Sequence, residues 1–425
     1  SETPAPETLG ESPVRKILIV GAGQSGLQLA LSLQAEGYDV TVLSARTADE
    51  IRGGWPTSTQ VMFDPALGYE RAYKLNLWED EAPHIPGVGV SLAPAPGTRA
   101  FHLWGPWDPY AMSVDQRLKM PAWLELFEDR GGRVIYHPVM TSDLAGLAPM
   151  YDLTLIAAGK GELVELFDRD PVRSSYDRPG RVLAAIYLHG MAEAREFADG
   201  SLRINVAPGA GELFTMPALT LSGPCRIAFL EAIPGGPFDA FRDRPDPAEH
   251  LRRVRRLLGE YLPWEGELYA GCEPTDARAS LSGAFTGTIR RPCAEVAPGH
   301  HVFGMADVVV VNDPIAGQGA NNAAHCAGIY AQAILARGDA PFDPAWMTET
   351  FETFWKTRAQ HSTALTDALL NPLPDHAQQV LGAASRYQEI ATRFCNLFPH
   401  PEDIGPFLGD PEAALAYVAQ VAARS

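Results

Sequence analysis

A GxGxxG motif near the start of the chain has the clearest chemical use. It comprises Gly21, Gly23 and Gly26, with Gln24 and Ser25 between the last two. In a dinucleotide site the first glycine permits a tight turn, the second lets backbone approach a pyrophosphate, and the third lets a helix pack closely on a strand. The N–H groups at the start of that helix then face the phosphates. We therefore predict that these five residues bind a dinucleotide; a glycine-rich turn without a ligand is the alternative.

A second motif follows much later in the chain. It combines a carboxylate at the end of a predicted strand, a loop stiffened by proline, and the glycine-rich start of a helix. Such a set can hold ribityl hydroxyl groups and stabilise negative charge on a reduced flavin ring. A turn cap and a plain turn are the alternatives for its single members. The cofactor-binding residues predicted here are Asp307, Pro314, Gly317, Gln318, Gly319, Ala320 and Asn321.

The elements around the first motif have the pattern of a βαβ unit. Residues 16–20 form a short apolar, β-branched run, which is typical of a strand buried on both faces. Residues 27–36 have helical apolar spacing that ends at Gly37, and residues 38–43 predict a second strand. This order opens a doubly wound parallel sheet and predicts an α/β fold.

The end of the second predicted strand departs from the usual motif. An acid that bonds a ribose hydroxyl is expected roughly 20 residues after the glycines, but Ser44, Ala45 and Arg46 stand there. Ser44 can still bond a ribose, and Arg46 can stack on adenine or meet a phosphate. We expect all three residues to contact the cofactor, in a site where the dinucleotide binds and dissociates reversibly.

Charge and composition argue against several classes of function. The 425 residues carry 34 basic and 52 acidic side chains, a formal net charge of −18. This leaves no basic footprint for nucleic acid or for an anionic membrane, and no apolar run reaches the ~18 residues of a membrane span. The five cysteines lack CxxC spacing, which favours reduced thiols in the cytoplasm over disulfides or a metal site.

Taken together, the two motifs resemble those of flavoprotein monooxygenases with the aromatic hydroxylase fold. Their second motif has an Asp, a Pro and a GQGxN run in this order, although Ala306 replaces the usual Gly before Asp307. Arg117 stands where such enzymes place an FAD-contacting Arg. The strand end at Gly159 lacks the Asp-Gly motif that single-component hydroxylases link to NAD(P)H use. In this respect the sequence resembles the two-component styrene and indole monooxygenases, over roughly residues 15–425.

This resemblance implies a reaction and its partners. A separate NADH-dependent flavin reductase would supply reduced FAD, which would react with O₂ to a C4a-hydroperoxide and epoxidise a small aromatic substrate. The segment after Gly53 resembles the indole branch, which implies indole as the substrate and indigo as the final pigment. The alternatives are a styrene epoxidase or aryl sulfide oxidase of the same family, and a flavin-binding protein without oxygenase activity.

The resemblance also implies substrate-site residues. Ser58, Gln60 and Met62 alternate, so on a strand they would project from one face. Ser58 or Gln60 would accept the indole N–H, and Met62 would pack on the ring. Core packing is the alternative for Met62, Ile85 and Val88. The full set predicted for the substrate pocket and the flavin face is Ser58, Gln60, Met62, Ile85, Val88, Ala111 and Pro314.

We expect a Rossmann-like FAD-binding domain, a second β-sheet domain for the substrate, and C-terminal helices. The FAD-binding domain is predicted at 14–52, 107–175 and 285–340, the substrate domain at 53–106 and 176–284, and the helical region at 341–425, after a disordered tail at 1–13. Residues 52–110 lack clear periodicity, which predicts short strands or loops over a functional site. A basic helix is predicted at 249–261, with its charges on a solvated face.

Overall fold

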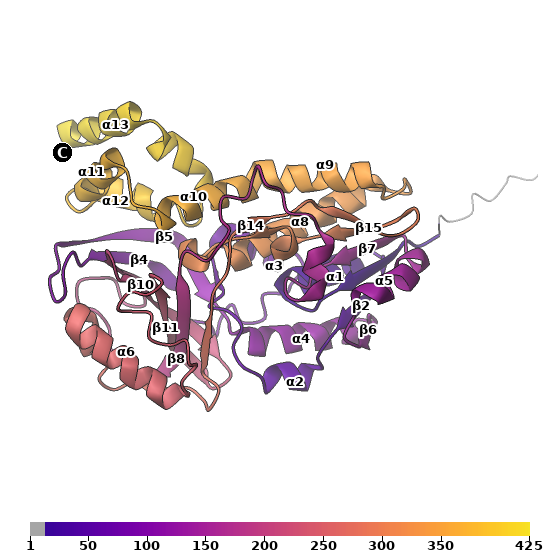
Figure 1. Cartoon of the computed structure of the whole chain (residues 1–425), viewed down its shortest axis with the longest axis horizontal. Helices are drawn as coiled ribbons and strands as arrows, with labels where there is room; N and C mark the ends of the chain where they lie inside the picture. The colour runs from indigo at the N-terminus through magenta and orange to yellow at the C-terminus, as the bar shows by residue number, and fades with distance from the viewer. Residues whose placement is uncertain (1–12) are drawn as a thin grey trace, which may run out of the picture.

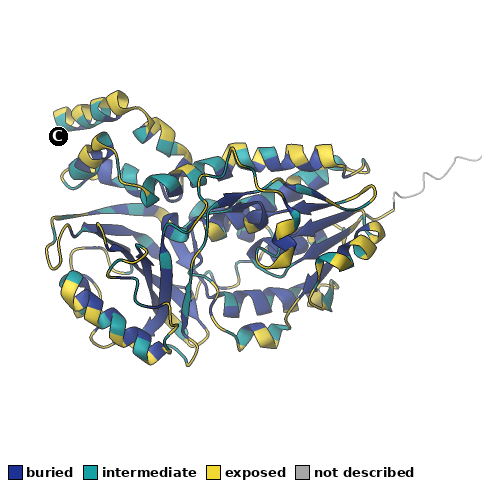
Figure 2. Cartoon of the chain, in the orientation of Figure 1, coloured by how far each residue is buried: buried dark blue, intermediate teal, exposed yellow. Residues whose placement is uncertain are grey.

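The computed structural model describes residues 13–425, so the tail predicted over residues 1–13 lies outside the described residues except for Pro13. Two large β-sheets stand beside each other and organise the chain (Figure 1). Strands of both sheets are largely buried, and exposed residues lie on the outer faces of helices such as α6 (Pro247–Tyr261), α9 (Pro344–Phe354) and α13 (Pro411–Arg424) (Figure 2).

The first sheet contains the predicted βαβ unit. β1 pairs in parallel with β2 and β7, β6 extends the sheet beside β2, and β16 extends it beside β7. Ile17, Leu18 and Ile19 are fully buried, which explains the β-branched run. The α/β prediction is confirmed. The strands in spatial order are β15 (Cys293–Ala297), β16 (His300–Gly304), β7 (Leu153–Ile156), β1 (Lys16–Val20), β2 (Asp39–Ser44) and β6 (Arg133–Tyr136).

Two helices that begin at the carboxyl edge of this sheet, α1 (Gln24–Ala35) and α8 (Gly319–Arg337), lie against each other. α9 packs on α8. Gln28 of α1 donates its amide Nε2–H to the carbonyl oxygen of Ala324 in α8, at 3.0 Å. The starts of the early and late helices are therefore held at one edge. The remaining helices of this half are α2 (Ala48–Arg52), α3 (Asp64–Ala72), α4 (Gln116–Asp129) and α5 (Thr141–Leu147).

The second sheet is larger and mainly antiparallel. It has nine strands, with β4 and β9 as a parallel pair in its middle. A separate pair joins β14 (Thr288–Ile289) to β17 (Val310–Val311). The strands of the large sheet are β12 (Glu273–Pro274), β8 (Val182–His189), β11 (Gly223–Ala232), β10 (Gly211–Thr220), β9 (Leu202–Ala207), β4 (Ile85–Leu92), β5 (Phe101–Ser113) and β3 (Val61–Met62), with β13 (Ser280–Gly283) beside β8.

Different helices pack on the two faces of the second sheet. The apolar side of α6 packs on one face, while Arg252 and Arg256 of that helix are exposed, as predicted for the basic segment. The other face shares a core with the C-terminal helices, for example through Val380 and Phe407. Those helices are α10 (Gln360–Leu370), α11 (Asp375–Ala384), α12 (Gln388–Cys395) and α13, and α7 (Pro263–Gly266) follows α6.

The prediction of short strands or loops for residues 52–110 was wrong. This segment contains α3 and two long strands, and β5 stays in the large sheet to Ser113, beyond the domain boundary expected at residue 106. β4 is buried along most of its length, so it shows no alternation of apolar and polar residues. Gly105 also breaks the pattern, because a Cβ there would lie 2.5 Å from the Cβ of Cys395. Between residues 13 and 425, none of the helices combines the length and the hydropathy that crossing a membrane requires.

Candidate cofactor and substrate site

The turn between β1 and α1 has the geometry of a phosphate loop. Gly21 has a φ of +120°, which favours glycine. A Cβ on Gly26 would lie 2.2 Å from the carbonyl oxygen of Gly21, so only glycine lets the helix pack this closely. A Cβ on Gly23 would meet nothing within 4 Å, so the space in front of this residue is open. Backbone N–H groups can therefore approach a ligand at Gly23.

The first turn of α1 is free to bind an anion. Its N-cap is Gly23, no side chain caps the helix, and no acidic residue lies in the first turn. Unpaired N–H groups and the helix dipole favour a phosphate at such an end. Ser25 and Gln24 are buried there, and the Gln24 amide donates to Glu70 Oε2 at 3.1 Å. The side chain of Gln24 is therefore bound by Glu70, and the backbone N–H groups at the start of α1 remain available to a ligand.

The end of β7 brings the two sequence motifs together. A Cβ on Gly21 would lie 2.7 Å from the nitrogen of Ala158, and a Cβ on Gly159 would lie 2.8 Å from the Cβ of Asp307. In addition, the N–H of Met305 donates to the carbonyl oxygen at the end of β7, Ile156, at 3.1 Å. The glycine loop and the Asp307 turn thus stand on opposite sides of one short connection.

Asp307 is the carboxylate of the second motif, and it remains accessible. Solvent reaches its side chain, but the protein around it removes enough hydration to raise the pKa to about 6, against the opposing charge of Lys160. Ala306 before it has a φ of +52°, the left-handed region that favours glycine. The backbone at this position therefore suits the Gly that the resemblance led us to expect before Asp307.

Side chains of the second motif hold its own loop. Asn321 is fully buried: its Oδ1 accepts from the N–H of Phe63 at 2.8 Å, and its Nδ2 donates to the carbonyl oxygens of Val61 and Gly317. Gln318 donates to the carbonyl oxygens of Ala316 and Phe398, at 2.8 Å each. These two side chains are already committed, so a cofactor at this helix would meet backbone N–H groups. α8 has no side-chain cap, and a Cβ on Gly319 would meet nothing within 4 Å.

The predicted cofactor residues at the end of β2, and Arg117, differ in their exposure and in their hydrogen bonds. Ser44 is buried and donates its hydroxyl to the carbonyl oxygen of Arg46 at 2.6 Å, whereas Ala45 and Arg46 are exposed. Arg117 is buried, and its guanidinium is bound by Asp115 and Asp276. These two carboxylates raise the pKa of Arg117 against the effect of burial. The ion pair between Arg117 and Asp276 therefore connects α4 with the segment between β12 and β13.

FAD fits this set of groups. Two helix starts without side-chain caps, two glycines facing open space and an accessible carboxylate converge at the carboxyl edge of the parallel sheet. Dinucleotides bind at this edge in doubly wound folds. When bound, the flavin supplies the redox chemistry with O₂.

A small apolar cavity lies beside the Pro314 turn. Its volume is about 20 Å³, whereas ligand cavities usually span about 300–1,000 Å³, so an aromatic ligand would require its side chains to move. Most of these residues could not be found from the sequence, because they come from seven separate segments without a shared motif. The cavity is lined by Thr59, Val61, Phe63, Trp107, Leu202, Ile204, Phe214, Met216, Phe229, Pro314, Ile315, Gly317 and Phe398.

The predicted alternation of Ser58, Gln60 and Met62 on one strand was wrong. β3 contains only Val61 and Met62, so Ser58 and Gln60 lie outside the strand, and Gln60 has a φ of +40°, which is not a strand conformation. The Gln60 amide donates to Ser113 and to the Tyr187 hydroxyl, at 3.1 and 3.0 Å. Met62 packs in the core of the first sheet, and its sulfur lies 3.4 Å from Lys119 Nζ. None of the three lines the cavity; their neighbours Thr59, Val61 and Phe63 do.

Ile85, Val88 and Ala111 are fully buried in the core of the second sheet. Ile85 and Ala111 are partners in the pairing of β4 with β5. They lie in the same apolar cluster as Val61 and Phe63, behind the residues that line the cavity. The structure thus gives them a packing role next to the cavity.

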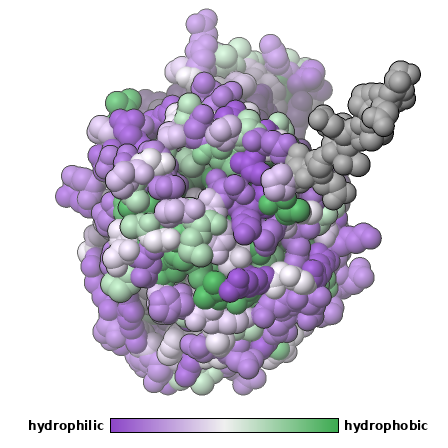
Figure 3. All heavy atoms as spheres, turned by 90° about the vertical axis from the view of Figure 1, so that its right-hand side faces the viewer, coloured by the Kyte–Doolittle hydropathy of each residue, from purple (hydrophilic) through white to green (hydrophobic). Residues whose placement is uncertain are grey.

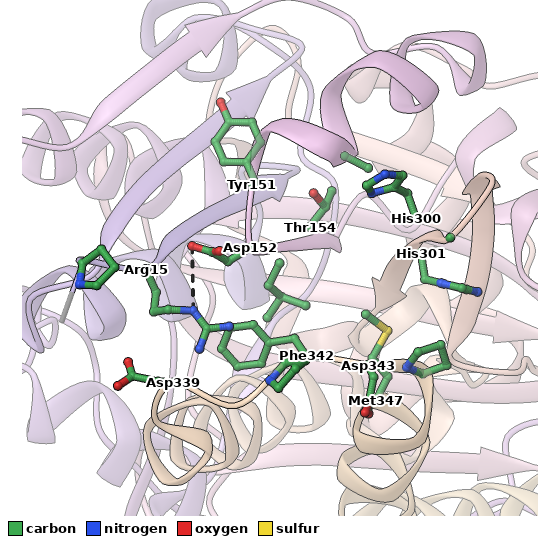
Figure 4. A pocket seen from close by; sticks show the side chains of 16 residues that line it. Arg15, Tyr151, Asp152, Thr154, His300, His301, Asp339, Phe342, Asp343 and Met347 are labelled. Carbon is green, nitrogen blue, oxygen red and sulfur yellow. Dashed lines mark ion pairs between the residues drawn. The ribbon is translucent and has the colours of Figure 1, made fainter.

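A larger cavity, of about 770 Å³, lies at the opposite edge of the first sheet. It is formed where strands begin, at residues such as Arg15, Thr154 and His300, and Arg15 pairs there with Asp152 (Figure 4). Hydrophobic residues at this end of the molecule gather in several small groups among hydrophilic ones (Figure 3). Because doubly wound folds bind ligands at the carboxyl edge, we do not assign the cofactor to this cavity.

Replacing Asp307 by Asn should weaken FAD binding and remove its pH dependence. The carboxylate of the unmodified chain ionises near pH 6, and a charge-assisted hydrogen bond of about 1.5–3 kcal/mol corresponds to about 10–100-fold in Kd. Titration with oxidised FAD should therefore give a Kd that rises as the pH falls through 6 in the original chain and stays flat in the variant. If the Kd of the Asp307→Asn variant still depended on pH, the pH dependence would come from a group other than Asp307.

Comparisons with known proteins show which proteins the chain resembles. Residues 159–267 match the family model described as "Styrene monooxygenase A putative substrate binding domain". The chain is 30% identical to the styrene monooxygenase StyA of Pseudomonas fluorescens, over 94% of this chain and 96% of that protein. It is 29% identical to StyA of a Pseudomonas species, over 96% and 98%. Among solved structures, p-nitrophenol 4-monooxygenase PnpA of Pseudomonas putida DLL-E4 is similar, with a TM-score of 0.58 and 14% identity over 96% and 97%. That likeness confirms the predicted fold, with two sheets and C-terminal helices.

Proposed function

Because the chain belongs to the styrene monooxygenase family, a family of flavin-dependent monooxygenases, we propose that it is the oxygenase component of a two-component system. In this proposal a separate NADH-dependent flavin reductase supplies reduced FAD, and O₂ is the oxidant. The substrate is a small aromatic molecule whose carbon–carbon double bond is epoxidised. The proposed cofactor residues are the glycine loop, Ser44 to Arg46, Asp307, and the backbone from Pro314 to Asn321.

The proposal rests mainly on one observation. The turn from Pro314 to Gly317 lines an apolar cavity and also adjoins the proposed FAD site. Pro314, Ile315 and Gly317 line the cavity, and the turn leads directly into the uncapped start of α8. A substrate bound among Phe63, Trp107 and Phe398 would thus lie next to the cofactor.

The residues around the cavity would orient the substrate and exclude water. Phe63 contacts Trp107 edge-on, with ring centroids 5.0 Å apart, and both rings contact Phe398. Aromatic walls bind a flat apolar ring through dispersion and edge-to-face contacts. A dry cavity also limits unproductive loss of oxidant to water. No acid or base is needed on the wall for oxygen transfer to an alkene.

The cavity favours styrene over indole as the substrate. Its walls are apolar except for Thr59. Gln60, whose amide oxygen was expected to accept the indole N–H, does not line the cavity, and its amide Nε2–H donates to Ser113 and Tyr187. Indole remains the second candidate, because the Thr59 hydroxyl could accept its N–H from the cavity wall. Aryl sulfides fit the same apolar walls. The likeness of Ser58, Gln60 and Met62 to the indole branch remains an argument from sequence alone.

Assays with a supplied reductase test the proposed function. The purified chain alone should not oxidise NADH. With a flavin reductase, FAD, NADH and O₂, it should convert styrene to its oxide, and any turnover of indole should produce blue pigment. NADH oxidation without reductase would contradict the two-component proposal, and bound FAD without any oxygenated product would favour a flavin-binding protein.

Replacing Thr59 by Val should separate the two substrates. Valine keeps the size of threonine but removes the hydroxyl, so styrene turnover should change less than about twofold. Loss of a hydrogen bond worth about 0.5–1.5 kcal/mol predicts about 2–10-fold lower kcat/KM for indole. Ser58→Ala, a neighbouring hydroxyl that does not line the cavity, is the matched control. An equal loss for both substrates would show that Thr59 acts through packing alone.

A further inference from the structure

Four ionisable side chains meet between the Pro314 turn and the second sheet. Glu231 of β11 and Glu212 of β10 are direct partners in the antiparallel pairing, and Arg181 immediately precedes β8. Arg181 binds Glu212 with two hydrogen bonds of 2.9 Å. Asp313 immediately precedes Pro314, and its Oδ1 accepts from the N–H of Ile315 at 2.9 Å.

Three carboxyl oxygens in this cluster lack a hydrogen-bond partner. They are both oxygens of Glu231, which is fully buried, and Oδ2 of Asp313, which is 3% exposed. The charge of Arg181 is already matched by Glu212. Glu231 and Asp313 interact directly through their side chains. Two such buried carboxylates without donors would lose their hydration and repel each other. A single proton supplies the donor that this pair lacks.

We propose that Glu231 and Asp313 share one proton in the folded protein, and that this proton fastens the Pro314–Gly317 turn to β11. One oxygen of Asp313 then caps the turn at Ile315, while the other bonds the sheet through Glu231. Glu231 is therefore a positioning residue. Its effect on the cofactor rests on the function proposed above, whereas the shared proton does not.

The directions of the pKa shifts agree with this arrangement. Burial raises the pKa of Glu231 well above its usual range, and the neighbouring Asp313 raises it further. Burial also raises the pKa of Asp313. The proton therefore resides mainly on Glu231, and the pair titrates as a unit.

Other titratable groups near the pair do not neutralise it. Tyr176 interacts with Asp313, and burial raises the pKa of Tyr176 to about 12, so it stays neutral. Asp367 of α10 faces Tyr176 and adds another carboxyl. Burial raises the pKa of Glu212 while Arg181 lowers it. Within residues 13–425 no group of three or more His, Cys, Asp or Glu side chains is placed to hold a metal ion.

Infrared spectroscopy of the cofactor-free protein tests the shared proton directly. The original chain should show the C=O stretching band of a buried carboxylic acid at neutral pH, and Glu231→Gln should lose it. Glu260→Gln, the same change at an exposed site, is the matched control and should keep the band. Absence of the band in the original chain at neutral pH would overturn the proposal without any variant.

Unfolding as a function of pH gives a second measurement. The folded protein retains a proton that an unfolded Glu, with a pKa near 4.3, releases. Rising pH therefore favours unfolding, by up to about tenfold in the unfolding constant per pH unit. Urea unfolding between pH 6 and 8 should show this slope in the original chain and in Glu260→Gln, and a flatter slope in Glu231→Gln. Parallel profiles for all three would contradict the shared proton.

Titration with oxidised FAD tests the positioning role. Glu231→Gln keeps a donor for Asp313 and should bind FAD within about threefold of the original Kd, whereas Glu231→Leu should raise Kd at least tenfold. If the leucine variant does not fold, Asp313→Leu can replace it in the same titration. Unchanged affinity in the leucine variants would overturn the positioning role. If oxygenase activity were absent while the infrared band and pH slope behaved as expected, only the proposed function would fall.

Discussion

Replacing Gly23 by alanine is expected to abolish FAD binding while the fold stays intact. A Cβ at this residue meets nothing within 4 Å, and its φ of −93° suits alanine. Because alanine is a poorer N-cap than glycine, we expect a loss of about 0.5–1 kcal/mol in unfolding free energy. The methyl group would instead occupy the space through which backbone must approach the pyrophosphate, so Kd should rise about 100-fold or more. FAD titration and urea unfolding of the same preparation measure both effects.

Gly26→Ala provides the matched control for this result. The same methyl group would lie 2.2 Å from the carbonyl oxygen of Gly21, and neither backbone can yield without disturbing β1 or α1. We expect a loss of about 1–3 kcal/mol in unfolding free energy, as in overpacked cores. One variant should therefore lose the ligand and the other should lose stability. If Gly23→Ala bound FAD normally, the cofactor would not cross this loop.

Replacing Glu70 by leucine should give the largest loss of stability that we predict. Glu70 and Lys119 form a buried ion pair of 2.5 Å between α3 and α4, and Glu70 also accepts from Gln24 at the phosphate loop. Their side chains are 3% and 5% exposed, so the leucine variant would leave an ammonium group buried without a counterion. Such a change costs about 3–5 kcal/mol. Urea unfolding measures this loss.

A double variant separates charge from packing at this pair. Adding Lys119→Met to Glu70→Leu removes the unpaired ammonium, so most of the lost stability should return. As a control, Asp49→Ala breaks the exposed pair with Arg52 and should cost less than about 0.5 kcal/mol. A double variant as unstable as Glu70→Leu alone would show that shape, and not charge, dominates the site.

Local sequence patterns were sufficient for the βαβ unit that opens the first sheet and for the phosphate loop. The β-branched run at residues 16–20, the glycine spacing from Gly21 and the helix stop at Gly37 each act through their neighbours in the chain. Hydrogen-bond periodicity and the conformational freedom of glycine are properties of a few consecutive residues. For the same reason the sequence predicted the helix after Gly319.

The tertiary structure alone decided which side chains face the cavity. Thr59, Val61 and Phe63 line the cavity while Met62 packs in the core of the first sheet, and the local sequence does not show which of the two alternating sets faces the cavity. Phe398 reaches the same cavity from the C-terminal helices, and no spacing in the sequence connects it with Pro314. Glu231 and Asp313 also lie far apart in the sequence, and no spacing in the sequence connects them.

The sequence by itself therefore determined the backbone that can hold a dinucleotide, and with it the class of cofactor. Only the tertiary structure decided the walls of the substrate cavity, the inward turn of Gln318 and Asn321, and the buried carboxyl pair. The physical reason is range: a backbone motif is stabilised within a few residues, whereas the direction of a side chain depends on packing partners far away in the chain.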